Sequence, residues 1–107
     1  DRDDDDILVE LASEAKMINL PPVANAGEDL TVKSNQDGTA EILLDGSASY
    51  DPDGEIILWE WIDERDRVFG DTPMIKVRVS KGTHVFRLRV KDDKNAMSQA
   101  IVTLRVI

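Results

Sequence analysis

Apolar and polar residues alternate in several short segments of the chain after residue 30. The clearest case is residues 74–79, where three aliphatic residues occupy one face and Met74, Lys76 and Arg78 the other. A period of two is that of a β-strand, in which successive side chains point to opposite faces. The alternation predicts strands at residues 30–33, 40–44, 56–62, 74–79, 83–90 and 99–107.

Turn residues separate these segments. The sequence Asp-Pro-Asp-Gly at residues 51–54 comes just before one predicted strand, Lys81 and Gly82 lie before another, and Asp-Asp-Lys-Asn at residues 92–95 lies before the last. Such residues favour tight turns. Several short strands joined in this way indicate an all-β sandwich or a small barrel.

Residues 1–20 differ in composition from the rest of the chain. Five of the first six residues are aspartate, the stretch carries a net charge of −5, and its remainder is mostly apolar. Pro21 and Pro22 follow, and two consecutive prolines continue neither a helix nor a central strand. We therefore expect an N-terminal arm or linker at residues 1–20 and a single β domain at residues 21–107.

The pattern of the arm does not decide its conformation. Ile7, Leu11, Ala15 and Ile18 have the spacing of a helical stripe, and a run of aspartates suits the start of a helix. Ile7, Val9 and Leu11 are spaced equally well for one face of a strand.

Composition excludes several classes of function. The chain of 107 residues has 22 acidic and 13 basic residues and a formal net charge of −9, which disfavours nucleic acid as a partner. It has no cysteine, so thiolate metal sites and thiol nucleophiles are excluded. Its longest apolar runs, of four or five residues, are too short for membrane insertion. With one histidine and no Gly-x-Ser-x-Gly motif, nucleophilic triads are incomplete, and no enzyme activity is expected.

Three segments, in chain order, resemble the PKD (polycystic kidney disease) domain. They are residues 23–27 (Val-Ala-Asn-Ala-Gly), residues 44–54 (Leu-Asp-Gly-Ser-Ala-Ser-Tyr-Asp-Pro-Asp-Gly) and residues 82–106. The third runs from Gly-Thr-His-Val-Phe through Val-Lys-Asp-Asp to Val-Thr-Leu-Arg-Val, and Trp61 matches the tryptophan of the family's strand C. Each motif alone is weak, but their joint occurrence is specific.

The resemblance covers about residues 22–107. It implies an all-β fold, an immunoglobulin-like two-sheet β-sandwich, here with an N-terminal extension. It also implies a non-catalytic, extracellular or cell-surface module that serves as a spacer or adhesion domain and contacts protein partners or neighbouring copies or domains. The sequence departs from the family at residues 62–70, where Ile-Asp-Glu-Arg-Asp-Arg-Val-Phe-Gly replaces the usual Asp-Phe-Gly-Asp-Gly.

Two other functions stay open at this point. The chain fits a self-assembling filament subunit whose N-terminal arm adds a strand to the sheet edge of the next copy. It also fits an accessory domain of a secreted hydrolase that binds a polysaccharide or protein substrate.

Oxygen-bearing side chains are expected to meet at one end of such a sandwich. By residue match to the family, Asn25, Asp51 and Asp92 are the best ligands there for Ca²⁺, a cation that takes six to eight oxygen ligands, and Asp53 and Asp93 lie beside them. Ca²⁺ is therefore a candidate cofactor of this domain. The alternative is structural, with the same residues capping their own turns.

The core is expected to form from the inward faces of the strands. It is predicted to contain Trp61, Phe86, Leu88, Val102 or Leu104, and Ile42 or Leu44.

Overall fold

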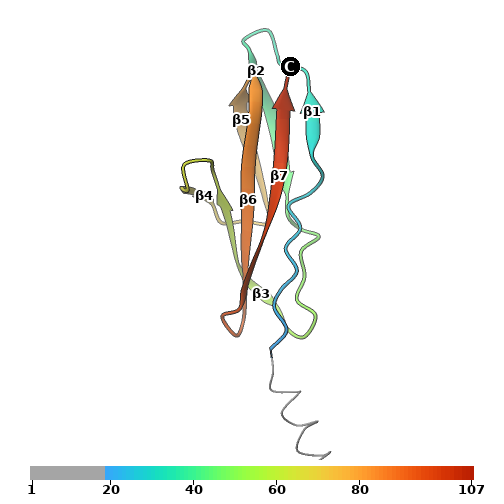
Figure 1. Ribbon diagram of the computed structural model, residues 1–107, viewed down its shortest axis with the longest axis vertical. Helices are drawn as coiled ribbons and strands as arrows, with labels where there is room; N and C mark the ends of the chain where they lie inside the picture. Colours follow the sequence, from blue (N-terminus) through green and yellow to red (C-terminus); the bar gives the residue numbers. More distant parts are fainter. Residues whose placement is uncertain (1–18) are drawn as a thin grey trace, which may run out of the picture.

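The computed structural model describes residues 19–107, which form seven strands and no helix (Figure 1). The strands are β1 (Leu30–Val32), β2 (Thr39–Asp45), β3 (Ile56–Ile62), β4 (Val68–Gly70), β5 (Met74–Ser80), β6 (Gly82–Asp92) and β7 (Met97–Val106). Whether the arm is helix or strand concerns residues 1–18, which lie outside the described part of the chain. Within residues 19–107 nothing is both helical and apolar over a length that would cross a membrane.

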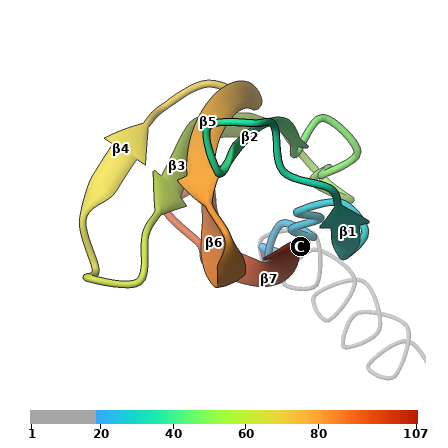
Figure 2. The same ribbon diagram turned by 90° about the horizontal axis from the view of Figure 1, so that it is seen from above.

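The strands form two layers (Figure 2). The larger sheet has the order β1-β7-β6-β3-β4, with β1 parallel to β7 and the other pairs antiparallel, and the smaller sheet pairs β2 with β5. The pairing of neighbouring strands places residues that point into the core opposite one another, for example Trp61 of β3 and Leu88 of β6 in the larger sheet. The predicted two-sheet β-sandwich is confirmed.

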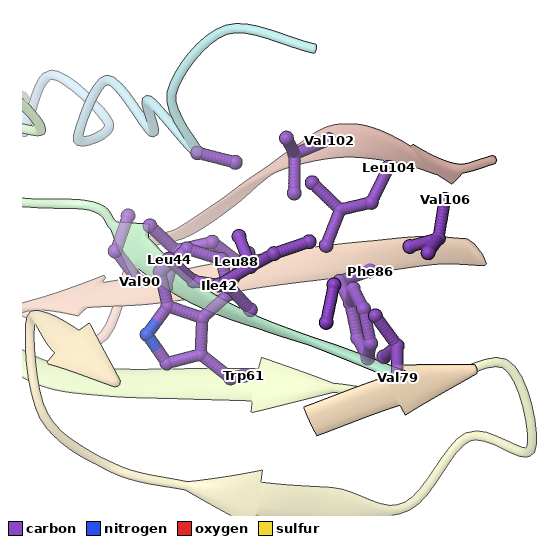
Figure 3. Packing of buried hydrophobic residues seen from close by; sticks show 12 residues of the cluster. Ile42, Leu44, Trp61, Val79, Phe86, Leu88, Val90, Val102, Leu104 and Val106 are labelled. Atoms are coloured by element: carbon purple, nitrogen blue, oxygen red, sulfur yellow. The ribbon is translucent and has the colours of Figure 1, made fainter. Parts of the chain in front are cut away.

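The apolar faces of the two sheets fill the space between them (Figure 3). Trp61 is completely buried, and its Nε1–H donates to the carbonyl oxygen of Thr72 at 3.0 Å, which satisfies the only polar atom of the ring. The core prediction is confirmed, since each residue named for it is buried: Ile42, Leu44, Trp61, Phe86, Leu88, Val102 and Leu104.

Two details of the strands differ from the sequence-based prediction. β6 and β7 are longer than the alternation indicated, because both extend toward the turn that joins them. β4 was not predicted, since three residues carry too little alternation to be recognised. It pairs with β3 across a bulge, so residues 62–70, where the sequence departs from the PKD pattern, form the end of β3, a loop and β4.

Gly46, directly after β2, leaves no room for a side chain. A Cβ atom there would overlap the Leu88 Cδ2 methyl group and lie 3.1 Å from Trp61 Cζ2, and both side chains are fully buried and cannot move aside. Gly46→Ala should therefore lower the free energy of unfolding by about 1–3 kcal/mol in urea denaturation. Gly54→Ala is the control, because the nearest atom there belongs to the exposed side chain of Asp93. Equal losses in the two variants would show that overlap is not the cause.

Candidate metal centre

One end of the sandwich brings together three segments that are far apart in the sequence (Figure 1). They are the entering segment at residues 19–25, the turn at residues 51–54 that leads into β3, and the turn at residues 93–96 between β6 and β7. All three segments therefore lie at the same end of the sandwich.

Backbone hydrogen bonds fix these segments to one another. The N–H of Val23 donates to the carbonyl oxygen of Tyr50 at 2.7 Å, and the N–H of Tyr50 donates back to that of Val23 at 3.0 Å. The N–H of Asp93 donates to the carbonyl oxygen of Glu55 at 3.0 Å, which joins the two turns. The positions of the side chains at this end are thus set by the backbone.

Asp92 is the last residue of β6, and its side chain is completely buried. Its Oδ1 accepts the N–H groups of Lys94 and Ala96, each at 2.9 Å, and its Oδ2 accepts the side-chain N–H of Asn19 at 2.5 Å. Burial raises the pKa of Asp92, but the hydrogen bonds that its carboxylate accepts and its contact with Asp51 outweigh burial. The pKa therefore lies below its usual value.

The pKa of Asp51 is shifted in the opposite direction from that of Asp92. Its Oδ1 accepts the N–H of Asp53 at 3.0 Å, whereas its Oδ2 is buried and receives no hydrogen bond from any residue between 19 and 107. Burial raises the pKa of Asp51 above its usual value, and the neighbouring carboxyl groups of Asp53 and Asp92 raise it further. A buried oxygen that receives no hydrogen bond destabilises the fold, unless another interaction compensates for the hydration that it has lost.

The entering segment reaches this group of acids through two consecutive residues. The N–H of Leu20 donates to Asp53 Oδ2 at 2.8 Å; this bond is the main reason that the pKa of Asp53 is lowered, followed by the side chain of Asp51. The side-chain N–H of Asn19 donates to Asp92, and its Oδ1 is buried without a hydrogen-bond donor in the described part of the chain. Two orphaned oxygens, Asn19 Oδ1 and Asp51 Oδ2, therefore belong to side chains that contact the same carboxylate.

These side chains fit a calcium ion. Ca²⁺ binds carboxylate and amide oxygens in a flexible geometry, and Asp51, Asp92 and Asn19 supply both kinds. A dication would also offset both causes of the raised pKa of Asp51, its burial and the neighbouring carboxyl groups. No three Asp, Glu or His side chains among residues 19–107 form a ready-made metal cluster. The Asn19 oxygen, backbone carbonyls or water would therefore have to complete the shell.

The structure places the predicted ligand Asn25 differently from Asp51 and Asp92. Its Oδ1 accepts the N–H of Gly27 at 2.9 Å, and its own N–H donates to Ser49 Oγ at 2.8 Å. Asn25 thus shapes the entering segment, while Asn19 is the amide that contacts Asp92. Calcium binding by the predicted residues stays a prediction.

The tryptophans of β3 and the histidine of β6 have structural contacts in the fold. The two tryptophans of β3 do not form an exposed platform, because Trp61 is buried and Trp59 packs partly against the core. The ring of His84 contacts the Ser80 carbonyl oxygen through Nε2 at 2.8 Å, and its Nδ1 lies 3.4 Å from the Glu64 carboxylate.

Comparison with known sequences matches this domain to a family. Residues 26–106 match the family model described as K319L-like, PKD domain. The chain is 34% identical over 97 residues to the "Dyslexia-associated protein KIAA0319 homolog" of Rattus norvegicus, an alignment that covers 83% of this chain and 9% of that protein. The chain therefore spans only a small part of the curated relatives that it matches.

Solved structures share the fold. The PKD1 domain of Vibrio anguillarum Epp superposes with a TM-score of 0.63 at 24% identity, covering 84% of this chain and 100% of that domain. The solution structure of the PKD domain from the KIAA 1837 protein gives a TM-score of 0.63 at 33% identity, covering 78% of this chain and 83% of that one.

Proposed function

The chain belongs to the K319L-like PKD domain family, and we propose that it is a non-catalytic extracellular module whose entering segment is held to the sandwich by a bound calcium ion. Membership of a family of PKD domains supports the proposal that the chain is a non-catalytic extracellular module. The calcium role is supported by one observation: two buried oxygens beside Asp92, Asn19 Oδ1 and Asp51 Oδ2, receive no hydrogen bond from within residues 19–107.

The position of Asn19 gives calcium a mechanical role in this proposal. Asn19 lies before Pro21 and Pro22, on the segment that leads into the domain, whereas Asp51 and Asp92 belong to the sandwich. A cation that binds both fixes the direction in which the chain enters. Residue 107 lies at the opposite end of the sandwich (Figure 1), so in a longer protein this domain would act as a spacer with one stiffened junction.

The chemistry also suits the proposed location. Extracellular modules commonly bind calcium with dissociation constants of about 10⁻⁴–10⁻³ M, which two carboxylates and neutral oxygens can supply. The protein would contribute oxygens and their positions, and the ion would contribute charge neutralisation and cross-linking. The one histidine contacts a backbone carbonyl and there is no cysteine, which supports a module without catalytic function.

The proposal predicts which asparagine matters for calcium. In isothermal titration with CaCl₂ after chelator treatment, the full chain should bind calcium saturably, and Asn19→Ala should weaken binding about tenfold through the loss of a ligand. Asn25→Ala is the matched control and should bind like the unchanged chain, because the Asn25 oxygen accepts the Gly27 N–H.

Two results would count against this assignment. Weakening by Asn25→Ala, with no effect of Asn19→Ala, would return the ligand role to Asn25. Absence of binding to the unchanged chain would remove calcium and leave Asp51, Asp53 and Asp92 as turn-capping residues.

A further inference from the structure

The chain passes from one part of the sandwich to the other at Gly27. Before this residue Val23 is bridged to Tyr50, and after it β1 pairs with β7. Gly27 has a φ of 86°, a conformation that favours glycine, and a Cβ atom there would lie 3.3 Å from the carbonyl oxygen of Asp45. The entering segment thus touches β2 only near its end and then turns away toward β7.

This turn leaves one edge of β2 without a partner. Among residues 19–107, β2 pairs only with β5, and β1 is likewise the last strand of its own sheet. In an antiparallel pair, alternate residues direct their N–H and C=O groups away from the neighbouring strand. The free edge of β2 therefore carries backbone groups that an added strand can use.

A cleft of about 380 Å³ lies between β2 and residues 25–30, along this edge. Its inner wall includes Leu44 of β2 and Leu104 of β7, both core residues. At its mouth the side chains of Leu30 and Leu43 are 42% and 50% exposed. The volume is that of a small ligand pocket, and the lining is largely apolar.

The charge of the lining residues indicates which kind of partner the cleft would bind. Glu28 and Asp45 line it, and no lysine, arginine or histidine is among the lining residues. Glu41, which is exposed two residues before Leu43 on β2, does not line the cleft and lies opposite Arg78 of β5. The chain's own residues 1–18, with seven acidic and two basic residues, have the wrong charge for this site. A basic partner is favoured.

We propose that this cleft binds an extended peptide of a partner protein, in which apolar residues alternate with lysine or arginine, as a strand added to the free edge of β2. Its backbone pairs with β2, its apolar side chains enter between Leu30 and Leu43, and its basic side chains face Glu28 and Asp45, the two acidic residues that line the cleft. This interaction surface goes beyond the proposed calcium role and lies on residues that the metal centre does not use.

The test uses the full chain and a synthetic six-residue peptide, acetylated and amidated, that alternates valine with lysine. Titration followed by amide NMR should give saturable shifts in residues 40–45 and added hydrogen-exchange protection there. The same peptide with N-methyl groups on alternate backbone nitrogens should not bind, because it lacks the donors for β2. A peptide that alternates valine with glutamate should also fail.

Glu28→Lys, at a lining residue, should bind the basic peptide about tenfold more weakly. Glu55→Lys changes the net charge equally at a residue that does not line the cleft and should leave binding unchanged. Equal weakening by both variants, or equal binding of the N-methylated peptide, would overturn the proposal in favour of general charge attraction. Self-association of the unchanged chain that Glu28→Lys abolishes would overturn it in favour of a second copy.

Discussion

Replacing Trp61 with alanine is expected to lower the free energy of unfolding by about 3–5 kcal/mol, the usual cost of removing a buried large aromatic side chain. The ring lies between the two sheets with no exposed surface, opposite Leu88 on the neighbouring strand (Figure 3). Its loss leaves a cavity and takes the Nε1–H donor from the Thr72 carbonyl oxygen. Because small domains have about 5–15 kcal/mol of stability in total, this variant should be close to unfolding.

Trp59→Ala is the matched control for this measurement. Trp59 lies two residues earlier on the same strand, opposite Val90, and packs only partly against the core. Urea denaturation should show a clearly smaller loss for Trp59→Ala than for Trp61→Ala. Losses of equal size would mean that the strand as a whole, and not the central ring, determines the stability of the sandwich.

The architecture was accessible from the sequence because each strand carries its own signal. The two-residue alternation in residues 74–79 and 83–90 marks which side chains point inward, and turn residues mark the ends. The pairing of β1 with β7 has no such local signal, since it depends on the turn at Gly27 and on contacts more than 70 residues apart. The open edge of β2 follows from that turn, and it could not be predicted from the sequence either.

The candidate metal centre could be predicted from the sequence only in part. Asp51 and Asp92 lie in turns whose sequences resemble the PKD domain, so their motifs identified them, and the structure brings them into contact. Asn19 was missed because the boundary set by Pro21 and Pro22 assigned it to the arm. Only the three-dimensional structure shows that its side chain reaches Asp92, and no periodicity or composition indicates a contact across 73 residues.

Asp51→Asn is expected to reverse the order of stability with and without calcium. In chelator at neutral pH the variant should melt at a higher temperature than the unchanged chain, because it removes a half-buried charge that faces Asp53 and Asp92. An asparagine keeps the oxygen that accepts the Asp53 N–H. In excess calcium the unchanged chain should gain about 2.7 kcal/mol at 100 times the dissociation constant, or roughly 10 °C or more, and the variant much less.

The pH dependence in chelator provides a second check of the same variant. The folded-state pKa of Asp51 is raised, so its ionisation destabilises the fold progressively as pH rises from its unfolded pKa through its folded pKa. Asp92 has a lowered pKa, so its contribution is present above its unfolded value and is lost as pH falls through the folded value. Ionisation of Asp51 should therefore lower the stability of the unchanged chain as pH rises above about 4, and Asp51→Asn should remove that contribution. The variant should keep the acid-side loss, which comes from the carboxyl groups with lowered pKa values: Asp37, Asp45, Asp53, Asp63 and Asp92. If thermal melts of the two proteins coincide in chelator and in calcium at every pH, Asp51 neither repels its neighbours nor binds the ion.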